Sequence, residues 1–222
     1  MSVAIALDGP AGAGKSSIAK RAAKALDFIY VDTGALYRTI GLAATRKGVE
    51  PKPSAEVEKL LSEITVDLNF NDKGEQIVLL DGEDVSEFIR TPEASMMASK
   101  ISAVPSVRAY LLDLQRNMAK AHNVIMDGRD IGTVVLPDAK VKIFLTASPE
   151  ARSQRRYKEL CEKGMDVKYE DILKDVITRD YNDSHRETAP LKPAEDCVMV
   201  DTTELDFEQS VEKIISVIKE NI

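Results

Sequence analysis

The chain has 222 residues, of which 44% are hydrophobic and 30% charged, and its formal net charge is −7. This composition is ordinary for a folded globular protein. The negative charge argues against a general nucleic-acid-binding surface, which needs a basic stripe. No apolar run approaches the roughly 20 residues of a membrane span, so we expect a cytoplasmic protein without membrane or nucleic-acid partners. Cys161 and Cys197 are isolated, without metal-type spacing, as is typical of reduced cysteines.

The first informative pattern lies near the N-terminus. Gly9, Gly14, Lys15 and Ser16 match G-x-x-x-x-G-K-[ST], which is moderately specific by itself. Apolar residues predict a strand over residues 3–7 and a helix over residues 18–26, which is the strand–loop–helix order of a phosphate-binding loop. Lys15 would reach the β- and γ-phosphates, and Ser16 would bind Mg²⁺. A nucleoside triphosphate is therefore expected at Gly9, Pro10, Ala11, Gly12, Ala13, Gly14, Lys15, Ser16 and Ser17.

The next segments alternate between buried strands and helices. Phe28–Asp32 is predicted to be a strand, and Ala35–Arg46 a helix. After a break at Gly48–Ser54, Ser54 is a suitable N-cap for a further helix, whose apolar residues recur at i, i+3, i+4 and i+7 from Val57. This alternation favours parallel β-α units over a sandwich.

The hydrophobic period then changes to two. Residues 66–70 alternate apolar and polar, and turn signals at residues 71–74 and at Asp81-Gly82 separate short apolar runs. A small antiparallel meander is therefore predicted over about Val66–Val85, and we interpret it as part of an inserted lobe. A helical stretch begins at Thr91, is broken by Pro105, and continues as a helix over Val107–Ala121.

Further apolar runs complete a parallel sheet. Strands are predicted over Asn123–Asp127, Val141–Thr146 and Cys197–Asp201, and a helix over Glu208–Ile218 closes the chain. With the two earlier strands, they predict an α/β protein with a five-stranded parallel sheet in a three-layer α/β/α arrangement. Ligands of such sheets bind at the carboxyl ends of the strands. The carboxylates expected there, beside the phosphate-binding loop, are Asp8, Asp32 and Asp127.

Three clusters of charged residues could serve phosphoryl transfer, which needs cations around the transferring phosphate. Arg129 and Asp130 follow the third strand. In a helix, one face would carry Arg152, Arg155 and Arg156, and another face would carry Arg179, Asp183 and Arg186. We interpret the first face as a mobile lid ending near Gly164. Surface ion pairs, a solvated basic face or intrahelical salt bridges would explain the same patterns without catalysis.

Taken together, these segments resemble the bacterial cytidylate kinases, which are P-loop nucleoside monophosphate kinases. The resemblance extends over nearly the whole chain, and the order of its later segments is specific to this family. It rests on Asp8–Ser16, Asp32–Arg38, Asp127–Thr133, Pro137–Ala139, Lys142–Ser148, the two arginine-bearing faces and Pro190-Leu191. It implies transfer of phosphate from ATP to CMP or dCMP with Mg²⁺, giving ADP and CDP or dCDP in pyrimidine nucleotide metabolism, by a monomeric cytoplasmic enzyme.

The resemblance also implies one cytidylate-kinase domain in three parts. The P-loop NTPase core would cover about residues 1–34, 107–150 and 167–222, the inserted monophosphate-binding lobe about residues 35–106, and the helical lid about residues 151–166.

The resemblance assigns roles to individual residues. CMP would be bound by Thr33, Tyr37, Arg38, Ser99, Arg108, Arg129, Asp130, Arg179, Asp183 and Arg186. The catalytic set would be Lys15, Arg129, Asp130, Arg152, Arg156, Arg179 and Arg186. Ser99 and Arg108 resemble the family's cytosine-recognising pair, Arg155 would join the ATP site, and Ser16 would bind Mg²⁺ together with phosphate oxygens and waters. Thr33 stands where some members have serine, which keeps the hydroxyl.

Two other functions remain open from the sequence. A P-loop kinase for another small acceptor, such as AMP, UMP or a metabolite, would use the same loop, and a panel of acceptors distinguishes it. A nucleotide-dependent switch would explain the loop but neither the arginine clusters nor the inserted lobe, and the chain has no Asn-Lys-x-Asp guanine-reading motif. The preference between CMP and dCMP is not determined by these residues.

Overall fold

A twisted parallel sheet forms the centre of the structure, a computed structural model that describes residues 2–71 and 74–222. The strand order is β2-β6-β1-β7-β8, with every neighbouring pair parallel, which confirms the predicted sheet. The predicted and observed ends differ by one residue at several strands, because the apolar pattern does not show where pairing stops. The strands are β1 (Ala4–Asp8), β2 (Ile29–Asp32), β6 (Val124–Gly128), β7 (Val141–Thr146) and β8 (Val198–Asp201).

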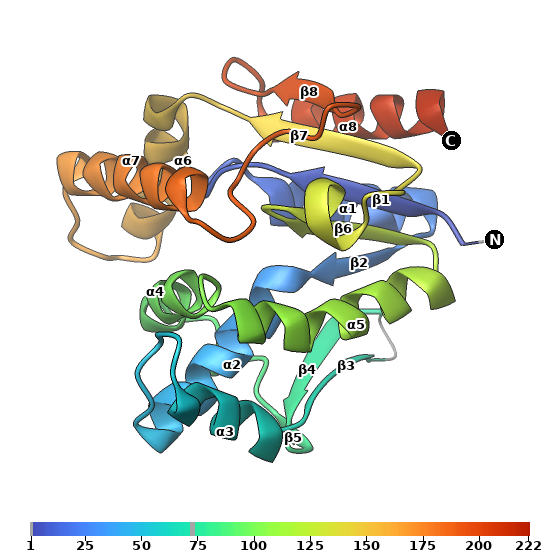
Figure 1. Ribbon diagram of the computed structural model, residues 1–222. Helices are drawn as coiled ribbons and strands as arrows, with labels where there is room; N and C mark the ends of the chain where they lie inside the picture. The colour runs from blue at the N-terminus through green and yellow to red at the C-terminus, as the bar shows by residue number, and fades with distance from the viewer. Residues whose placement is uncertain (1, 72–73) are drawn as a thin grey trace.

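Helices cover both faces of this sheet, as the predicted three-layer arrangement requires (Figure 1). Side chains alternate along β1, so that Ile5 and Leu7 pack with α1 and α8 while Ala6 belongs to the core formed with α2 and α5. The helices are α1 (Lys15–Leu26), α2 (Thr33–Lys47), α3 (Ala55–Glu63), α4 (Pro92–Ile101), α5 (Pro105–Ala121), α6 (Pro149–Glu162), α7 (Tyr169–His185) and α8 (Phe207–Asn221), with a short π-helix, η1 (Ile131–Val135). None of the helices in the described residues is long and apolar enough to cross a membrane.

A second, antiparallel sheet lies below the parallel one in Figure 1. It consists of β3 (Val66–Phe70), β4 (Gln76–Leu80) and β5 (Glu83–Asp84), which confirms the predicted meander. The predicted turn at residues 71–74 includes residues 72 and 73, which lie outside the described residues. Val66 and Leu80 are buried in the same core as α2, α3 and α5, so this sheet packs mainly on the helices.

Caps set several of the helix ends. The Ser54 hydroxyl accepts a hydrogen bond from the N–H of Val57 at 3.3 Å, which confirms its predicted role as the N-cap of α3. This helix ends at Glu63, so Ile64, which the periodicity placed on its apolar face, lies just beyond it and is still buried in the core. Thr91 caps α4 through the N–H of Ala94 at 3.1 Å.

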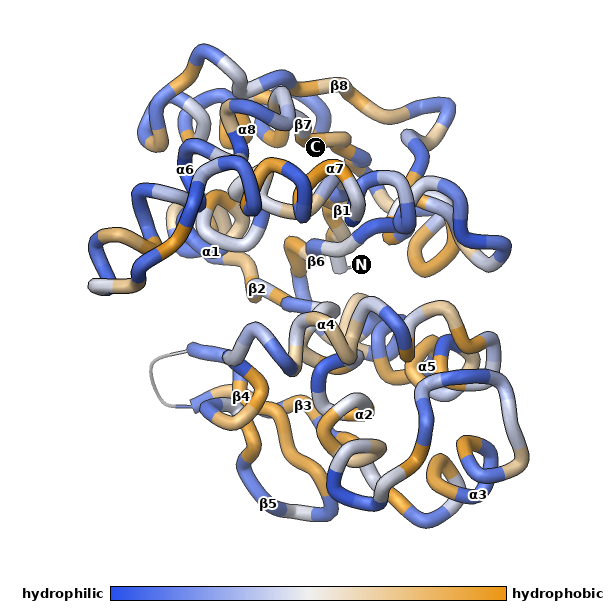
Figure 2. Tube along the Cα trace, turned by 90° about the vertical axis from the view of Figure 1, so that its left-hand side faces the viewer, coloured by the Kyte–Doolittle hydropathy of each residue, from blue (hydrophilic) through white to orange (hydrophobic). Residues whose placement is uncertain are grey.

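The helices α6 and α7 form an antiparallel pair joined by a short connection. Leu160 of α6 packs against Ile172 and Val176 of α7. Gly164, just after α6, has a left-handed φ of 73°, a conformation that favours glycine. Figures 1 and 2 both place this pair above α4, on the side of the parallel sheet where the strands end.

Candidate active site

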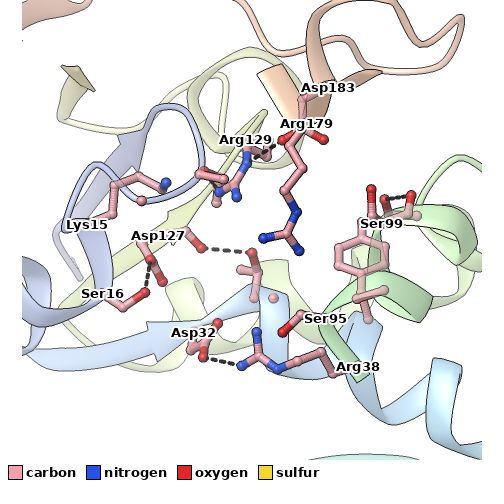
Figure 3. Close-up of a pocket in the computed structure, with 18 of the residues that line it drawn as sticks. Lys15, Ser16, Asp32, Arg38, Ser95, Ser99, Asp127, Arg129, Arg179 and Asp183 are labelled. Carbon is pink, nitrogen blue, oxygen red and sulfur yellow. Dashed lines mark hydrogen bonds and ion pairs between the residues drawn. The ribbon is translucent and has the colours of Figure 1, made fainter. Parts of the chain in front are cut away.

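A cavity of about 500 Å³ lies at the carboxyl ends of the parallel strands (Figure 3). Its walls come from the phosphate-binding loop, from β2 and β6, and from α2, α4, α5, α6, α7 and the start of α8. It brings together most of the residues singled out from the sequence: Ala11, Gly12, Gly14, Lys15, Ser16, Ser17, Thr33, Tyr37, Arg38, Ser99, Arg108, Arg129, Asp130, Arg152, Arg155, Arg156, Arg179, Asp183 and Arg186. Gly9, Pro10 and Ala13 belong to the same loop but do not line the cavity.

The shape of the phosphate-binding loop depends on Gly9, and a hydrogen bond from Lys15 connects its two ends. Gly9 has a φ of 151°, and a Cβ there would lie 2.0 Å from the carbonyl oxygen of Leu145, so a side chain is excluded. Lys15 is buried, and its ammonium group donates to the carbonyl oxygen of Pro10 at 2.8 Å, across the loop. Burial lowers the pKa of Lys15, and the neighbouring Arg129 adds to this effect. The loop therefore holds the Lys15 amine in a fixed place at one end of the cavity, where binding of an anion would favour its charged form.

Asp127, at the end of β6, connects the loop to the sheet. Its carboxylate accepts hydrogen bonds from the hydroxyl of Ser16 at 2.8 Å and from the hydroxyl of Tyr30 at 3.1 Å. Burial, followed by the nearby Asp32, raises the pKa of Asp127 to about 6. A hydroxyl and a carboxylate side by side are the oxygen ligands that Mg²⁺ prefers, so these residues fit the metal inferred from the sequence. Among the described residues, no group of three or more acidic, histidine or cysteine side chains could hold a metal.

A buried cluster of two arginines and one aspartate closes the opposite end of the cavity. Asp130, whose side chain is 6% exposed, is ion-paired with Arg108 and, at 3.3 Å, with Arg186. The Arg108 guanidinium also lies 5.5 Å from the centre of the Tyr37 ring, in a cation–π arrangement. This end of the cavity therefore offers positive charge next to an aromatic face.

The sequence predicted that Arg179, Asp183 and Arg186 share one helix face, but this prediction is wrong for Arg186, which lies outside the helix. The helix α7 ends at His185, and Arg186 has an extended backbone with ψ of 142°. Its side chain donates to the carbonyl oxygen of Ala189 at 2.7 Å and turns toward Asp130, contacts that no helical spacing reveals. Arg186 thus reaches the cavity from beyond the helix.

Arg129 and Arg179 share the space between the two ends of the cavity. Arg129 is ion-paired with Asp183 at 2.8 Å, so Asp183 does not form the intrahelical salt bridges that its spacing allowed. Within the described residues, Arg179 makes no hydrogen bond or ion pair, and its side chain extends into the middle of the cavity (Figure 3). A half-buried arginine without a protein partner is a candidate for binding an anion.

The three arginines of α6 have different partners, although α6 is helical as predicted. Arg152 is 2% exposed, is ion-paired with Asp180 of α7, and donates to the carbonyl oxygen of Ala11 at 2.8 Å. Arg155 donates to the carbonyl oxygen of Thr202, whereas Arg156 pairs with Glu159 at 2.8 Å near the surface. Arg152 therefore ties α6 and α7 to the phosphate-binding loop, and of the three only Arg156 resembles part of a solvated basic face.

Comparison with known proteins decides the family. The sequence model described as "Cytidylate kinase" matches residues 5–220. A protein named cytidylate kinase from Caldanaerobacter subterraneus subsp. tengcongensis is 50% identical over 221 residues, which cover 100% of this chain and 96% of that protein. One of the same name from Caldicellulosiruptor saccharolyticus is 51% identical over 214 residues, covering 95% and 93%. The chain belongs to the cytidylate kinase family.

The overall fold of this cytidylate kinase family member is also found in a protein of low sequence identity. A crystal structure of an uncharacterized protein from Eubacterium ventriosum superposes with a TM-score of 0.51, covering 98% of this chain and 99% of that chain at 13% identity. At this identity the likeness concerns the fold alone. The resemblance drawn from the sequence motifs is confirmed by the family match and by the near-complete coverage of both relatives.

Several residues at the cavity were missed from the sequence of this cytidylate kinase family member. Ser95 and Ser102 line it from either side of Ser99, and Ser95 lies one helical turn before Ser99, which was an available signal. Glu159 and Phe207 also line it, but no motif marks them. Tyr30 supports Asp127 from an adjacent strand, a pairing that only the folded sheet reveals.

Asp8, at the end of β1, is a buried carboxylate with backbone partners. Its oxygens accept hydrogen bonds from the N–H groups of Ile131 at 2.8 Å and Gly132 at 2.7 Å. Burial raises its pKa from the ordinary 3.8 to about 6, although these two hydrogen bonds act in the opposite direction. The carboxylate thus fixes the first turn of η1, directly after Arg129 and Asp130.

We expect the contribution of Asp8 to the free energy of unfolding to fall as the pH rises from about 4 to about 6. The folded state keeps the proton in this window while the unfolded state releases it, so the stabilisation is full below the unfolded pKa and is lost above the folded one. At about 1.4 kcal/mol per pH unit, the loss is about 3 kcal/mol. Urea unfolding of the wild type and Asp8→Asn across this window measures it.

The control for this prediction is Asp138→Asn, which changes an exposed carboxylate. The stability of Asp8→Asn relative to the wild type should improve with rising pH, whereas that of Asp138→Asn should stay constant. A constant difference for Asp8→Asn would contradict the prediction.

Proposed function

We propose that this protein transfers the γ-phosphate of ATP to CMP or dCMP with the help of Mg²⁺. The proposal rests chiefly on Arg179, which has no hydrogen-bond or ion-pair partner among the described residues and lies in one cavity with the phosphate-binding loop and the Arg108–Asp130–Arg186 cluster. A protein that only binds or hydrolyses a nucleotide needs one group of cations for its phosphates, and not a second group at the other end of the cavity. Relatives named cytidylate kinase, about half identical over their full length, support the choice of cytidine monophosphates as acceptors.

The donor half of the site is the phosphate-binding loop. We propose that the N–H groups at the start of α1 and the ammonium group of Lys15 bind the ATP phosphates, with Lys15 leaving Pro10 to do so. Ser16 and Asp127 would hold Mg²⁺ together with phosphate oxygens and waters. When bound, this ion supplies positive charge to the β- and γ-phosphate oxygens.

The acceptor half is formed by α2, α4 and α5 and by the residues after β6. We propose that Arg38 binds the CMP phosphate and that the pyrimidine lies near Tyr37, where Arg108 already stacks on the ring. Ser99 and Arg108 offer hydrogen-bonding groups for a base. Such groups reject a base that leaves them unpaired, which is the physical origin of strong discrimination. Thr33, Arg129, Asp130, Asp183 and Arg186 line the remaining wall.

Transfer itself would depend on positioned cations. Arg179 extends into the middle of the cavity, from where it would contact the phosphates of both substrates, and its guanidinium fork suits a pair of phosphate oxygens. Arg156 would exchange its partner Glu159 for ATP, and Arg152, with Arg155, would keep α6 against the loop. We propose that about residues 151–166 act as the lid, whose closure excludes water and prevents hydrolysis of ATP.

We also propose how the rest of the chain is divided between an acceptor-binding lobe and a core. Residues 35–106 would form the acceptor-binding lobe, and residues 1–34, 107–150 and 167–222 the core. We propose that the enzyme works as a monomer in the cytoplasm.

A panel of acceptors tests the proposal. With ATP and Mg²⁺ fixed, kcat/KM for CMP or dCMP is expected to exceed that for AMP by at least about 100-fold, since a base pocket built on hydrogen bonds discriminates by such factors or more. A coupled assay of ADP formation measures each acceptor, and UMP serves as the closest control. Equal or better activity with AMP would overturn the assignment in favour of another small-acceptor kinase.

A further inference from the structure

Gln76, the first residue of β4, makes an unusual contact with the parallel sheet. Its side-chain oxygen accepts a hydrogen bond from the backbone N–H of Asp32 at 2.8 Å, and its side-chain nitrogen donates to the carbonyl oxygen of Asp32 at 3.2 Å. These two bonds reproduce the exchange by which one strand residue pairs with another. Because β2 is an edge strand of the parallel sheet, the carboxamide completes its open side at this one residue.

Asp32, which is hydrogen-bonded to Gln76, in turn holds Arg38 at the wall of the cavity. One carboxylate oxygen of Asp32 caps α2 by accepting from the N–H of Ala35 at 3.0 Å. The other accepts from the guanidinium of Arg38 at 2.7 Å, as Figure 3 shows. Gln76, Asp32 and Arg38 therefore form a continuous chain from the antiparallel sheet to the cavity wall.

Asp32 and Arg38 both lie close to Gly34, where a side chain would crowd the two of them. A Cβ on Gly34 would lie 3.1 Å from a carboxylate oxygen of Asp32 and 3.1 Å from a guanidinium nitrogen of Arg38. The Nε of Arg38 is buried and has no hydrogen-bond partner within the described residues. The guanidinium is thus fixed at one nitrogen, with a second donor unused.

We propose that Gln76 is a positioning residue for the acceptor phosphate, acting through Asp32 on Arg38. The proposal rests on CMP being the acceptor. In this arrangement the antiparallel sheet packs on α2 and also sets the direction of Arg38, through Gln76 at the start of β4. Loss of the Gln76 bonds would leave two edge groups of β2 without their partner and let Asp32 and Arg38 shift together.

The variant Gln76→Met tests this because it keeps the length of the side chain and removes both hydrogen bonds. The KM for CMP and the Kd for CMP, measured by calorimetry, are expected to rise about tenfold, which is the effect of about 1.4 kcal/mol. The KM for ATP should stay within about twofold of the wild-type value, because within the described residues the Gln76 side chain makes no hydrogen bond to Lys15 or to the phosphate-binding loop. Gln76→Glu, which keeps the acceptor and loses the donor, is expected to raise the KM for CMP as well.

A double-mutant cycle separates positioning from simple packing. If Gln76 acts through Arg38, Gln76→Met has no further effect on CMP binding in the Arg38→Ala background. The matched control is Ser86→Ala, which removes the hydrogen bond from the N–H of Val78 to Ser86 at 3.0 Å inside the same antiparallel sheet. This control should leave both KM values within about twofold of the wild type.

Three results would overturn the proposal. They are an equal rise of KM for both substrates, an undiminished effect of Gln76→Met in the Arg38→Ala background, and loss of folding in Gln76→Met but not in Ser86→Ala. Failure of the proposed function is recognised separately, because the wild-type protein would then neither bind nor phosphorylate CMP.

Discussion

Replacing Arg179 by methionine is expected to lower kcat with CMP by about 1,000-fold. An arginine that stabilises the charge of a transferring phosphoryl group contributes factors of this size or larger. Methionine keeps the apolar stem of the side chain and removes the guanidinium. Because Arg179 makes no hydrogen bond or ion pair within the described residues, the free energy of unfolding should change by less than about 1 kcal/mol. Steady-state kinetics and urea unfolding of the same preparation measure both quantities.

The control for this variant is Arg21→Met on α1. Arg21 is exposed, and its partner is Glu208 on α8, at 3.8 Å, away from the cavity. Its removal should leave kcat within about twofold of the wild type, since exposed pairs contribute little. A kcat of Arg179→Met close to that of Arg21→Met would exclude Arg179 from the transfer step.

Replacing Asp130 by asparagine is expected to destabilise the protein by about 3 kcal/mol. Asp130 is the shared partner of Arg108 and Arg186, and all three side chains are less than 10% exposed. Removing one charge from a buried pair leaves the other without compensation, which typically costs about 3–5 kcal/mol. Asparagine keeps the shape and one acceptor, so the lower end of that range applies. Urea unfolding without nucleotide measures the loss.

The matched control is Glu83→Gln, which breaks an exposed pair between an arginine and a carboxylate. Glu83 accepts two hydrogen bonds from Arg46 at 2.6 and 3.0 Å on the surface. Water solvates both groups after the substitution, so the expected loss is below about 1 kcal/mol. Equal losses for Asp130→Asn and Glu83→Gln would show that the buried cluster is not held by its charge.

The layered fold could be predicted because its signals are local. Apolar runs mark β1, β2, β6, β7 and β8 in the sequence, and the change to a period of two marks the antiparallel sheet. The phosphate-binding loop is equally accessible, because Gly9, Gly14, Lys15 and Ser16 are spaced by the requirements of one turn and one helix start. Even so, the predicted and observed helix ends differ by up to three residues, since α1 begins inside the predicted loop at Lys15.

The partners of the charged residues could not be predicted, because they depend on contacts between distant segments. Helical spacing suggested that Asp183 lies between Arg179 and Arg186, whereas it pairs with Arg129 from the end of β6. Spacing also placed Arg186 on α7, although the helix stops one residue earlier. Tyr30 and Gln76 carry no motif at all, since each acts through a hydrogen bond formed only when strands from different parts of the chain meet.

In the proposed reaction, a phosphate is transferred within one cavity from a donor half to an acceptor half. The most direct measurement uses ATP labelled at the γ-phosphate, mixed with CMP, Mg²⁺ and the wild-type protein, with the products separated by chromatography. We expect the label to appear in CDP, with release of inorganic phosphate at least about 100-fold slower, because lid closure excludes water. Label found in inorganic phosphate at the same rate with and without CMP would contradict it.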